Sequence, residues 1–167
     1  GSDIFPYLQR NLDDIITVED EELVVAFLDM VENHKMIVEN SGLLTVAALK
    51  HLNIKNKKIV SILSGGNMDV ITMSSVVQQG LIFRDRIFTV SVLLPDKPGE
   101  LCRVSGIIAE ASGNVIKLEH NQFVSTNRNA AVELRITMEA FGTEHKGQIM
   151  EALKEKGYMP KLVRTNI

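Results

Sequence analysis

The sequence predicts a chain of two parts. Residues 1–85 are expected to form an incomplete α/β segment with a partial parallel sheet, and residues 86–167 an α+β domain of βαββαβ order. Two observations on the pattern of apolar residues predict this division, and the composition predicts a folded chain. Apolar β-branched runs alternate with helical patterns in the first half, whereas apolar and polar residues alternate along the strands of the second half. The 167 residues are 45% apolar and 23% charged, which is typical of a folded globular chain.

The first half is expected to form short strands at 15–18, 36–38 and 58–63, each followed by a helix. The acidic run 19–22 suits the positive N-terminal end of a helix, and apolar residues then recur at helical spacing. Alternating strands and helices indicate a parallel sheet, and a nearly continuous apolar run such as 59–63 belongs inside one. Because three strands make a thin sheet, we expect the remaining strands on residues that this chain does not contain.

The second half opens with the alternating strand 88–94, which stops at the Pro- and Gly-rich loop 95–99. Pro98 is well placed near the start of a helix, because the amide that it lacks would have no partner there. The helix that follows has an apolar stripe, and Gly113 is expected to close it in the left-handed conformation.

Two further strands are expected at 114–123 and 130–139, joined by the polar loop 125–129. The second of them alternates cleanly, so that one of its faces is expected to be wet. A helix from Thr143 to Gly157 and a last strand around 161–164 complete the βαββαβ order. This order predicts an antiparallel four-stranded sheet with two helices on one face.

Composition excludes several classes of function. A net charge of -3 with scattered basic residues gives no footprint for nucleic acid. No window approaches the roughly 20 apolar residues of a membrane helix, so we expect a cytoplasmic protein without a membrane partner. The single Cys102 excludes an internal disulfide and a cysteine-based metal site, and no metal is expected. Three histidines are expected to be isolated and solvated, namely His34, His51 and His145.

The loop from Asp96 to Leu101 is the first candidate site. A loop that feeds a helix start presents free backbone N–H groups, which can hold a carboxylate, and the Asp96 side chain can pair with an ammonium group. Together these describe a receptor for a free amino acid. A turn that uses Pro and Gly for backbone reasons alone explains the same residues.

Residues 86–167 resemble the ACT family of regulatory domains, in their βαββαβ order and in the segment Asp-Lys-Pro-Gly-Glu-Leu at 96–101. The resemblance implies a ferredoxin-like fold in which a small effector, usually an amino acid, binds beside this loop at an interface between domains. For His120, a surface role is equally open. The residues that the resemblance assigns to the effector are Asp96, Gly99, Glu100, Leu101, Asn114 and His120.

The turn at 64–67, Ser-Gly-Gly-Asn, ends the strongest strand of the first half and is the second candidate site. It lacks the Gly-Lys-Ser/Thr ending of a phosphate-binding P-loop, and a tight turn explains it as well. Five segments, however, resemble the last part of the catalytic domain of threonine dehydratases, and they occur in the same order over about residues 3–83. They are 5–7, 13–18, the acidic helix start, 38–42 and the segment that contains this turn. Threonine dehydratases are pyridoxal phosphate enzymes of fold type II.

The resemblance implies that Ser64 hydrogen-bonds the pyridine nitrogen of pyridoxal phosphate, which leaves the ring a moderate electron sink. The residues that it assigns to the cofactor are Ser64, Gly65, Gly66, Asn67 and Glu39. The family's Schiff-base lysine and phosphate-binding loop are not found in this sequence. The available lysines are expected to be surface charges, so this chain is expected to bind no cofactor and to have no catalytic residue of its own.

The leading hypothesis is the C-terminal regulatory part of a threonine dehydratase, whose whole protein deaminates L-threonine to 2-oxobutanoate and ammonia. Isoleucine is the expected effector, by analogy with the family. The alternative is an oligomerisation module of ACT type that binds no ligand, and a small complete enzyme that uses Ser64 is a third possibility. A homo-oligomer is expected through the second half and through exposed edges of the first.

Overall fold

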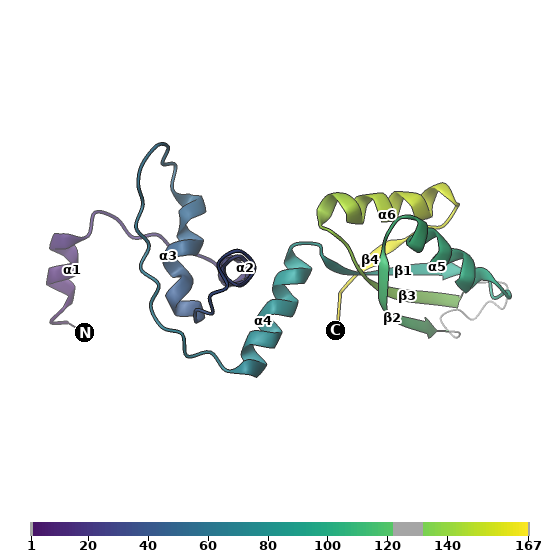
Figure 1. Cartoon of the computed structure of the whole chain (residues 1–167), viewed down its shortest axis with the longest axis horizontal. Coiled ribbons are helices and arrows are strands. Elements are labelled where there is room, and N and C mark those ends of the chain that lie inside the picture. Colours follow the sequence, from purple (N-terminus) through teal and green to yellow (C-terminus); the bar gives the residue numbers. More distant parts are fainter. Residues whose placement is uncertain (1, 122–131, 167) are drawn as a thin grey trace. The chain divides into compact units, whose positions relative to one another are not determined.

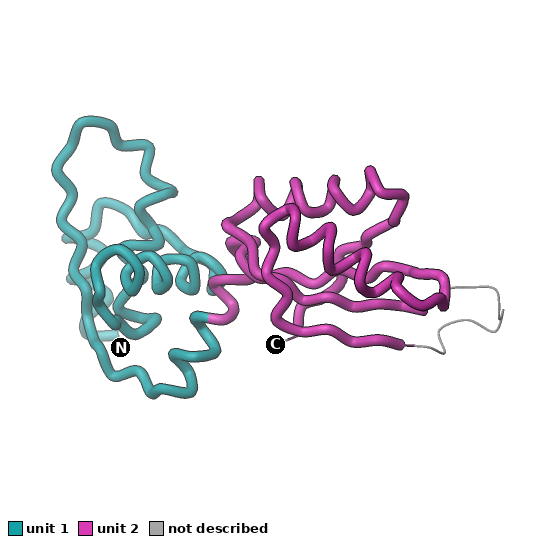
Figure 2. Tube along the Cα trace, turned by 45° about the vertical axis from the view of Figure 1, so that its right-hand side comes forward, with its two compact units in different colours: residues 1–77 teal, residues 78–167 magenta. Residues whose placement is uncertain are grey.

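The computed structural model describes residues 2–121 and 132–166. The chain divides into two compact units, residues 1–77 and residues 78–167 (Figure 2). Each unit has its own apolar core, and helix α4 (Val70–Phe83) runs across the division between them. The boundary at 85/86 that the sequence indicates stays a prediction.

The first unit is helical (Figure 1). Helix α2 begins with a capping box, in which Glu19 and Glu22 each accept a hydrogen bond from the other's backbone, and it has three acidic residues in its first turn. It passes into the π-helical turn η1, which ends at the left-handed Lys35. The short elements η2 and α3 pack against α2 around the fully buried Phe27 and Leu43. The elements before α4 are α1 (Phe5–Asn11), α2 (Asp20–Asp29), η1 (Met30–His34), η2 (Asn40–Leu43), α3 (Leu44–Ala47) and η3 (Ala48–His51).

The structure corrects the expected parallel sheet. Residues 2–69, all of them described, contain no strand, and the segments 15–18, 36–38 and 58–63 run without regular structure. Val60 is 90% exposed, so the apolar run around it is not buried as its composition suggested. The reason is that β-branched composition expresses only a preference, whereas a strand also requires a neighbouring backbone that exchanges ladder hydrogen bonds with it.

The second unit confirms the βαββαβ order. Its sheet has the strand order β2-β3-β1-β4 with antiparallel pairing throughout, and α5 and α6 cover one face (Figure 1). The expected loop 125–129 and the strand ends 122–123 and 130–131 lie outside the described residues. The elements are β1 (Ile87–Leu94), α5 (Glu100–Glu110), β2 (Asn114–Asn121), β3 (Val132–Glu139), α6 (Thr143–Glu155) and β4 (Lys161–Val163).

The core of this unit lies between the sheet and the two helices. Val90, Val92, Leu134 and Ile136 point into it from the central strands and are fully buried, as the alternation predicted. Gly113 contributes differently from the expectation. The left-handed residue after α5 is Ser112 (φ 61°), whereas a Cβ on Gly113 would lie 2.8 Å from Ile108 Cγ2. Gly113 is therefore required for close packing and not for a left-handed turn.

The face of the sheet opposite the core is polar, as the alternation of β3 predicted, but it is not wet throughout, because Thr89, Ser91 and Thr137 are buried. The hydroxyls of Thr89 and Thr137 share a hydrogen bond of 2.9 Å. Ser91 donates to Glu133 at 2.6 Å, and Arg135 pairs with the same carboxylate at 3.2 Å. The Ser91 hydrogen bond, followed by Arg135, lowers the pKa of Glu133 despite partial burial. The side chains on this face of the sheet are therefore held together by hydrogen bonds and an ion pair and not by apolar contacts.

His145 corrects a second expectation, because it is buried and not solvated. Its Nδ1 accepts a hydrogen bond from the Phe141 amide at 3.1 Å, and its Nε2 lies 2.7 Å from the Ala111 carbonyl oxygen. Only the Nε2–H tautomer satisfies both contacts, since an amide can only donate and a carbonyl can only accept. His145 thereby ties the start of α6 to the end of α5.

Candidate functional site

The loop between β1 and α5 forms the first candidate site. Gly99 stands immediately before α5 with φ 90°, and nothing lies within 4 Å of the place where its Cβ would be. Glycine is therefore needed there for its backbone conformation and not for space. The side chains of Asp96 and Lys97 are exposed, and the carboxylate of Asp96 has no hydrogen-bond partner among the described residues. An exposed carboxylate beside a helix start is thus available to a ligand.

Glu100, the first residue of α5, is held within the chain. Its Oε1 accepts from Arg103 Nη1 at 2.8 Å, and its Oε2 accepts from the Tyr158 hydroxyl at 3.1 Å. The side chain of Glu100 is only 12% exposed. Burial raises the pKa of Tyr158, and so do the hydrogen bond and charge of Glu100, so the phenol remains a donor at neutral pH. Sequence reasoning missed Tyr158 because it is 58 residues away from Glu100.

The other effector residues that the sequence suggested are placed at different ends of the domain. Leu101, the second residue of α5, is 42% exposed. His120 pairs with Leu134 toward the loop end of the sheet, whereas Asn114 pairs with Glu139 at the opposite end. Asn114 donates a hydrogen bond of 2.8 Å to the Glu139 carboxylate. Within one copy of the chain, the loop and Asn114 are therefore separated by the length of β2, roughly 23 Å at about 3.3 Å per residue.

The second candidate site brings together two loops of the first unit. The Glu39 amide donates to the Gly65 carbonyl at 3.3 Å, and the Glu39 carboxylate accepts from the Ser41 hydroxyl at 2.6 Å. A Cβ on Gly65 would lie 2.4 Å from the Glu39 carboxylate, and one on Gly42 would lie 1.9 Å from the Ser64 carbonyl oxygen. The glycines thus permit the contact between the segments 39–42 and 64–67, and Glu39 and Ser64 share one cluster.

The remaining residues of this cluster are exposed. The Ser64 hydroxyl and the Asn67 side chain have no hydrogen-bond partner in the described part of the chain. After them, Asp69 starts α4 by accepting from the amides of Ile71 and Thr72 at 3.0 and 2.9 Å. The side-chain hydrogen bond from Thr72, followed by the one from its amide, lowers the pKa of Asp69. The turn therefore leads directly into a helix, as expected.

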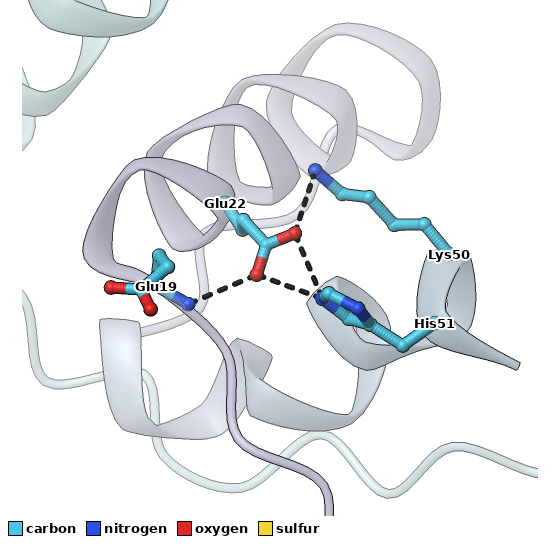
Figure 3. A network of polar contacts seen from close by, with 4 residues as sticks. All are labelled: Glu19, Glu22, Lys50 and His51. Atoms are coloured by element: carbon cyan, nitrogen blue, oxygen red, sulfur yellow. Dashed lines mark hydrogen bonds and ion pairs between the residues drawn. The ribbon is translucent and has the colours of Figure 1, made fainter.

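A third polar cluster, which sequence reasoning missed, centres on Glu22 (Figure 3). His51 Nε2 lies 2.9 Å from both Glu22 oxygens, and Lys50 Nζ lies 3.5 Å from one of them. The expectation that His51 is isolated is thus wrong. The Glu19 amide, followed by His51, lowers the pKa of Glu22 from 4.5 to about 2. The cluster ties the start of α2 to η3 and indicates no chemistry beyond this.

We expect the Glu22 cluster to make the first unit sensitive to acid. Because the pKa of Glu22 is lower in the folded state, its contribution to stability is present above pH 4.5 and is lost as the pH falls toward 2. Glu22→Gln should remove this part of the acid dependence of unfolding, measured by circular dichroism between pH 6 and roughly pH 2. Glu21→Gln is the matched control, and equal acid dependence in both variants would contradict the assignment.

Among the described residues, no group of three or more His, Cys, Asp or Glu side chains could hold a metal ion. In the same part of the chain, no helix has both the length and the apolarity to cross a membrane.

Comparison with known proteins identifies the class of the second unit first. Residues 88–157 match the family model of the ACT domain, so the chain contains an ACT domain that includes the loop at 96–101. Among solved structures, the prephenate dehydratase of Streptococcus mutans matches 46% of this chain over 40% of its own length. The identity is 21% and the TM-score is 0.39, so this likeness carries no conclusion.

The whole chain then matches a particular group of enzymes. The L-threonine ammonia-lyase of Geobacter sulfurreducens is 33% identical over 166 residues, which are 98% of this chain and 41% of that protein. The L-threonine ammonia-lyase of Thermotoga maritima is 30% identical over 164 residues, with the same two shares. The chain is thus homologous over nearly its full length to threonine ammonia-lyases, and it spans 41% of the length of these two relatives.

Proposed function

We propose that this chain is the regulatory C-terminal region of a pyridoxal phosphate-dependent threonine ammonia-lyase, and that its ACT domain binds an amino-acid effector such as isoleucine. The whole protein would deaminate L-threonine to 2-oxobutanoate and ammonia. Similarity to two L-threonine ammonia-lyases over 98% of the chain supports the first part of the proposal. The ACT match and the exposed loop around Asp96 support the second part.

The observation that carries the effector proposal is the position of β2 at the edge of the sheet. Within the described residues β2 pairs with β3 on one side only, which leaves eight residues of backbone on the other. If the β2 strands of two copies pair antiparallel about a twofold axis, the Asn114 end of one strand meets the loop end of the other. The residues that one copy keeps apart, Asn114 and the loop at 96–101, then line one site between two copies.

The chemistry of this site suits a free α-amino acid. Asp96 would supply a carboxylate for the ammonium group, and backbone N–H groups at the start of α5 would hold the ligand carboxylate. Leu101, which is 42% exposed in the first turn of α5, would offer apolar contact to an aliphatic side chain. The Asn114 amide adds a polar contact from the second copy.

Calorimetric titration of the full chain with isoleucine, valine, threonine and serine tests the proposal. We expect isoleucine to bind with one site per ACT domain, and light scattering to give the mass of at least a dimer. The absence of binding heat and of thermal stabilisation with all four amino acids would overturn the effector proposal.

The alternative function is oligomerisation without a ligand, and the exposed β2 edge by itself favours it. Ile116 and Leu118 on this strand are 40% and 38% exposed. We expect Leu118→Lys to reduce self-association, measured by light scattering, because a charge at a strand edge opposes pairing. Under the effector proposal isoleucine affinity falls together with the dimer, whereas under the alternative the dimer is lost and no ligand binding exists to be lost.

The cluster of Glu39, Ser64 and Gly65 could contact one side of a pyridoxal phosphate ring. The exposed Ser64 hydroxyl has no hydrogen-bond partner among the described residues and is available to the pyridine nitrogen. Gly65 and Glu39 would form the adjoining wall, and no lysine lies in the segments 39–42 and 64–67. When bound, the cofactor supplies an electron sink for the substrate. The residues here would orient its ring, so we propose that this chain alone does not deaminate threonine.

A further inference from the structure

Among the described residues, Glu100 is the only side chain that anchors the effector loop, residues 95–101, to the rest of the domain by a hydrogen bond. Residues 95–101 are all described, and only Glu100 among them forms side-chain hydrogen bonds with other residues that the structure describes. The other side chains of this segment are exposed. Among the described residues, the side-chain contact that fixes the position of the loop is therefore the one made by the Glu100 carboxylate.

The partner of this carboxylate lies in a different connection of the fold. Tyr158 follows Gly157 (φ 86°), which comes after the end of α6, just as Glu100 follows Gly99 (φ 90°) at the start of α5. Tyr158 also packs against the core of the second unit and is partly buried. The bond of 3.1 Å between the two side chains thus joins the turn before α5 to the turn that leads into β4.

We propose that Glu100 is a positioning residue and that Tyr158, through it, fixes the effector loop and couples ligand binding to the turn between α6 and β4. This inference rests on the proposed effector function and deepens it. It gives Glu100 a role that differs from direct ligand contact, and it assigns a function to Tyr158, which the sequence did not single out.

The physical basis of the proposal is preorganisation. A loop held in its binding conformation loses less entropy when the ligand binds, so the removal of its anchor weakens binding without removing a ligand contact. Arg103 comes from α5 itself, three residues after Glu100, so it orients the carboxylate but cannot hold the loop against another element. The Tyr158 hydroxyl is the link to the rest of the domain, and binding at the loop must by reciprocity affect its turn.

Tyr158→Phe tests the link because it deletes one hydroxyl and keeps the packed ring. We expect isoleucine affinity, measured by calorimetry on the full chain, to fall about five- to tenfold, which corresponds to the roughly 1–1.4 kcal/mol that one intramolecular hydrogen bond contributes. The chain has one other tyrosine, Tyr7, which is 66% exposed in the first unit, so Tyr7→Phe is the matched control with unchanged affinity.

Hydrogen exchange separates positioning from a general loss of stability. In Tyr158→Phe we expect faster exchange of the amides at 96–101, with unchanged exchange in the core strands β1 and β3. Isoleucine should slow exchange at 157–160 in the wild type and not in Tyr158→Phe. Glu100→Gln, which keeps an acceptor for the phenol, should retain more affinity than Glu100→Ala.

The possible outcomes decide the two proposals separately. If the wild type binds isoleucine and Tyr158→Phe binds it equally well, the positioning role is wrong and the effector function stands. If the wild type binds none of the four amino acids, the effector function is wrong. The hydrogen-exchange rates at 96–101, compared between Tyr158→Phe and the wild type, then test by themselves whether Tyr158 fixes the loop. Unchanged loop exchange in Tyr158→Phe would then overturn the positioning role as well.

Discussion

Asp96→Asn is expected to weaken isoleucine binding by roughly 10- to 100-fold, because it removes the charge of the hydrogen bond to the ligand ammonium group. The substitution is nearly isosteric, and the Asp96 side chain is exposed without a partner among the described residues, so folding should be unaffected. Calorimetric titration measures the loss, and the thermal midpoint without ligand checks that the fold is intact.

Glu110→Gln is the control for Asp96→Asn. It removes one negative charge from the exposed C-terminal end of the same α5 helix, so a long-range effect of net charge would appear in both variants. Equal affinity in Asp96→Asn and in the wild type would show that the loop carboxylate does not contact the ligand.

Gly42→Ala is expected to destabilise the first unit by about 3 kcal/mol or more, at or above the upper end of overpacking effects. Its Cβ would lie 1.9 Å from the Ser64 carbonyl oxygen and 2.8 Å from Val38 Cγ1. Because one of these atoms belongs to the backbone, the two loops of the Glu39 and Ser64 cluster must separate. Urea unfolding, monitored by hydrogen exchange separately for each unit, measures the loss of stability in the first unit.

Gly106→Ala provides the matched control for Gly42→Ala. Gly106 lies inside α5, and nothing is within 4 Å of the place of its Cβ. Alanine there should stabilise the second unit by about 0.5–1 kcal/mol through its better helix propensity. The prediction fails if Gly42→Ala unfolds at the urea concentration of the wild type.

The second unit was predictable because its signals are local. The alternation in β1 and β3 directly marks the residues that form the apolar core, and the loop at 96–101 marks the start of α5. What could not be predicted depends on contacts distant in sequence. Tyr158 meets Glu100 across 58 residues, and His145 meets Ala111 across 34. No spacing rule connects such residues before the fold is known.

The first unit shows the limit of composition as a guide. Val60 and Ile62 have the side chains of a buried strand, yet they are 90% and 73% exposed. Strand preference needs a partner backbone, and none of the described residues supplies one to this segment. The meeting of Glu39 with Gly65 followed from the resemblance to threonine dehydratases and not from any pattern within the two loops.

The two edges of the sheet in the second unit differ in length, and this difference limits growth into larger assemblies. β4 has only three residues, whereas β2 at the other edge has eight. A sheet with two long free edges can add copies end to end and form fibres, but a three-residue edge is a poor template for a further strand. Once two β2 strands have paired with each other, the joined sheet offers only these short edges at its ends. Self-association through this sheet is therefore expected to stop at a closed pair.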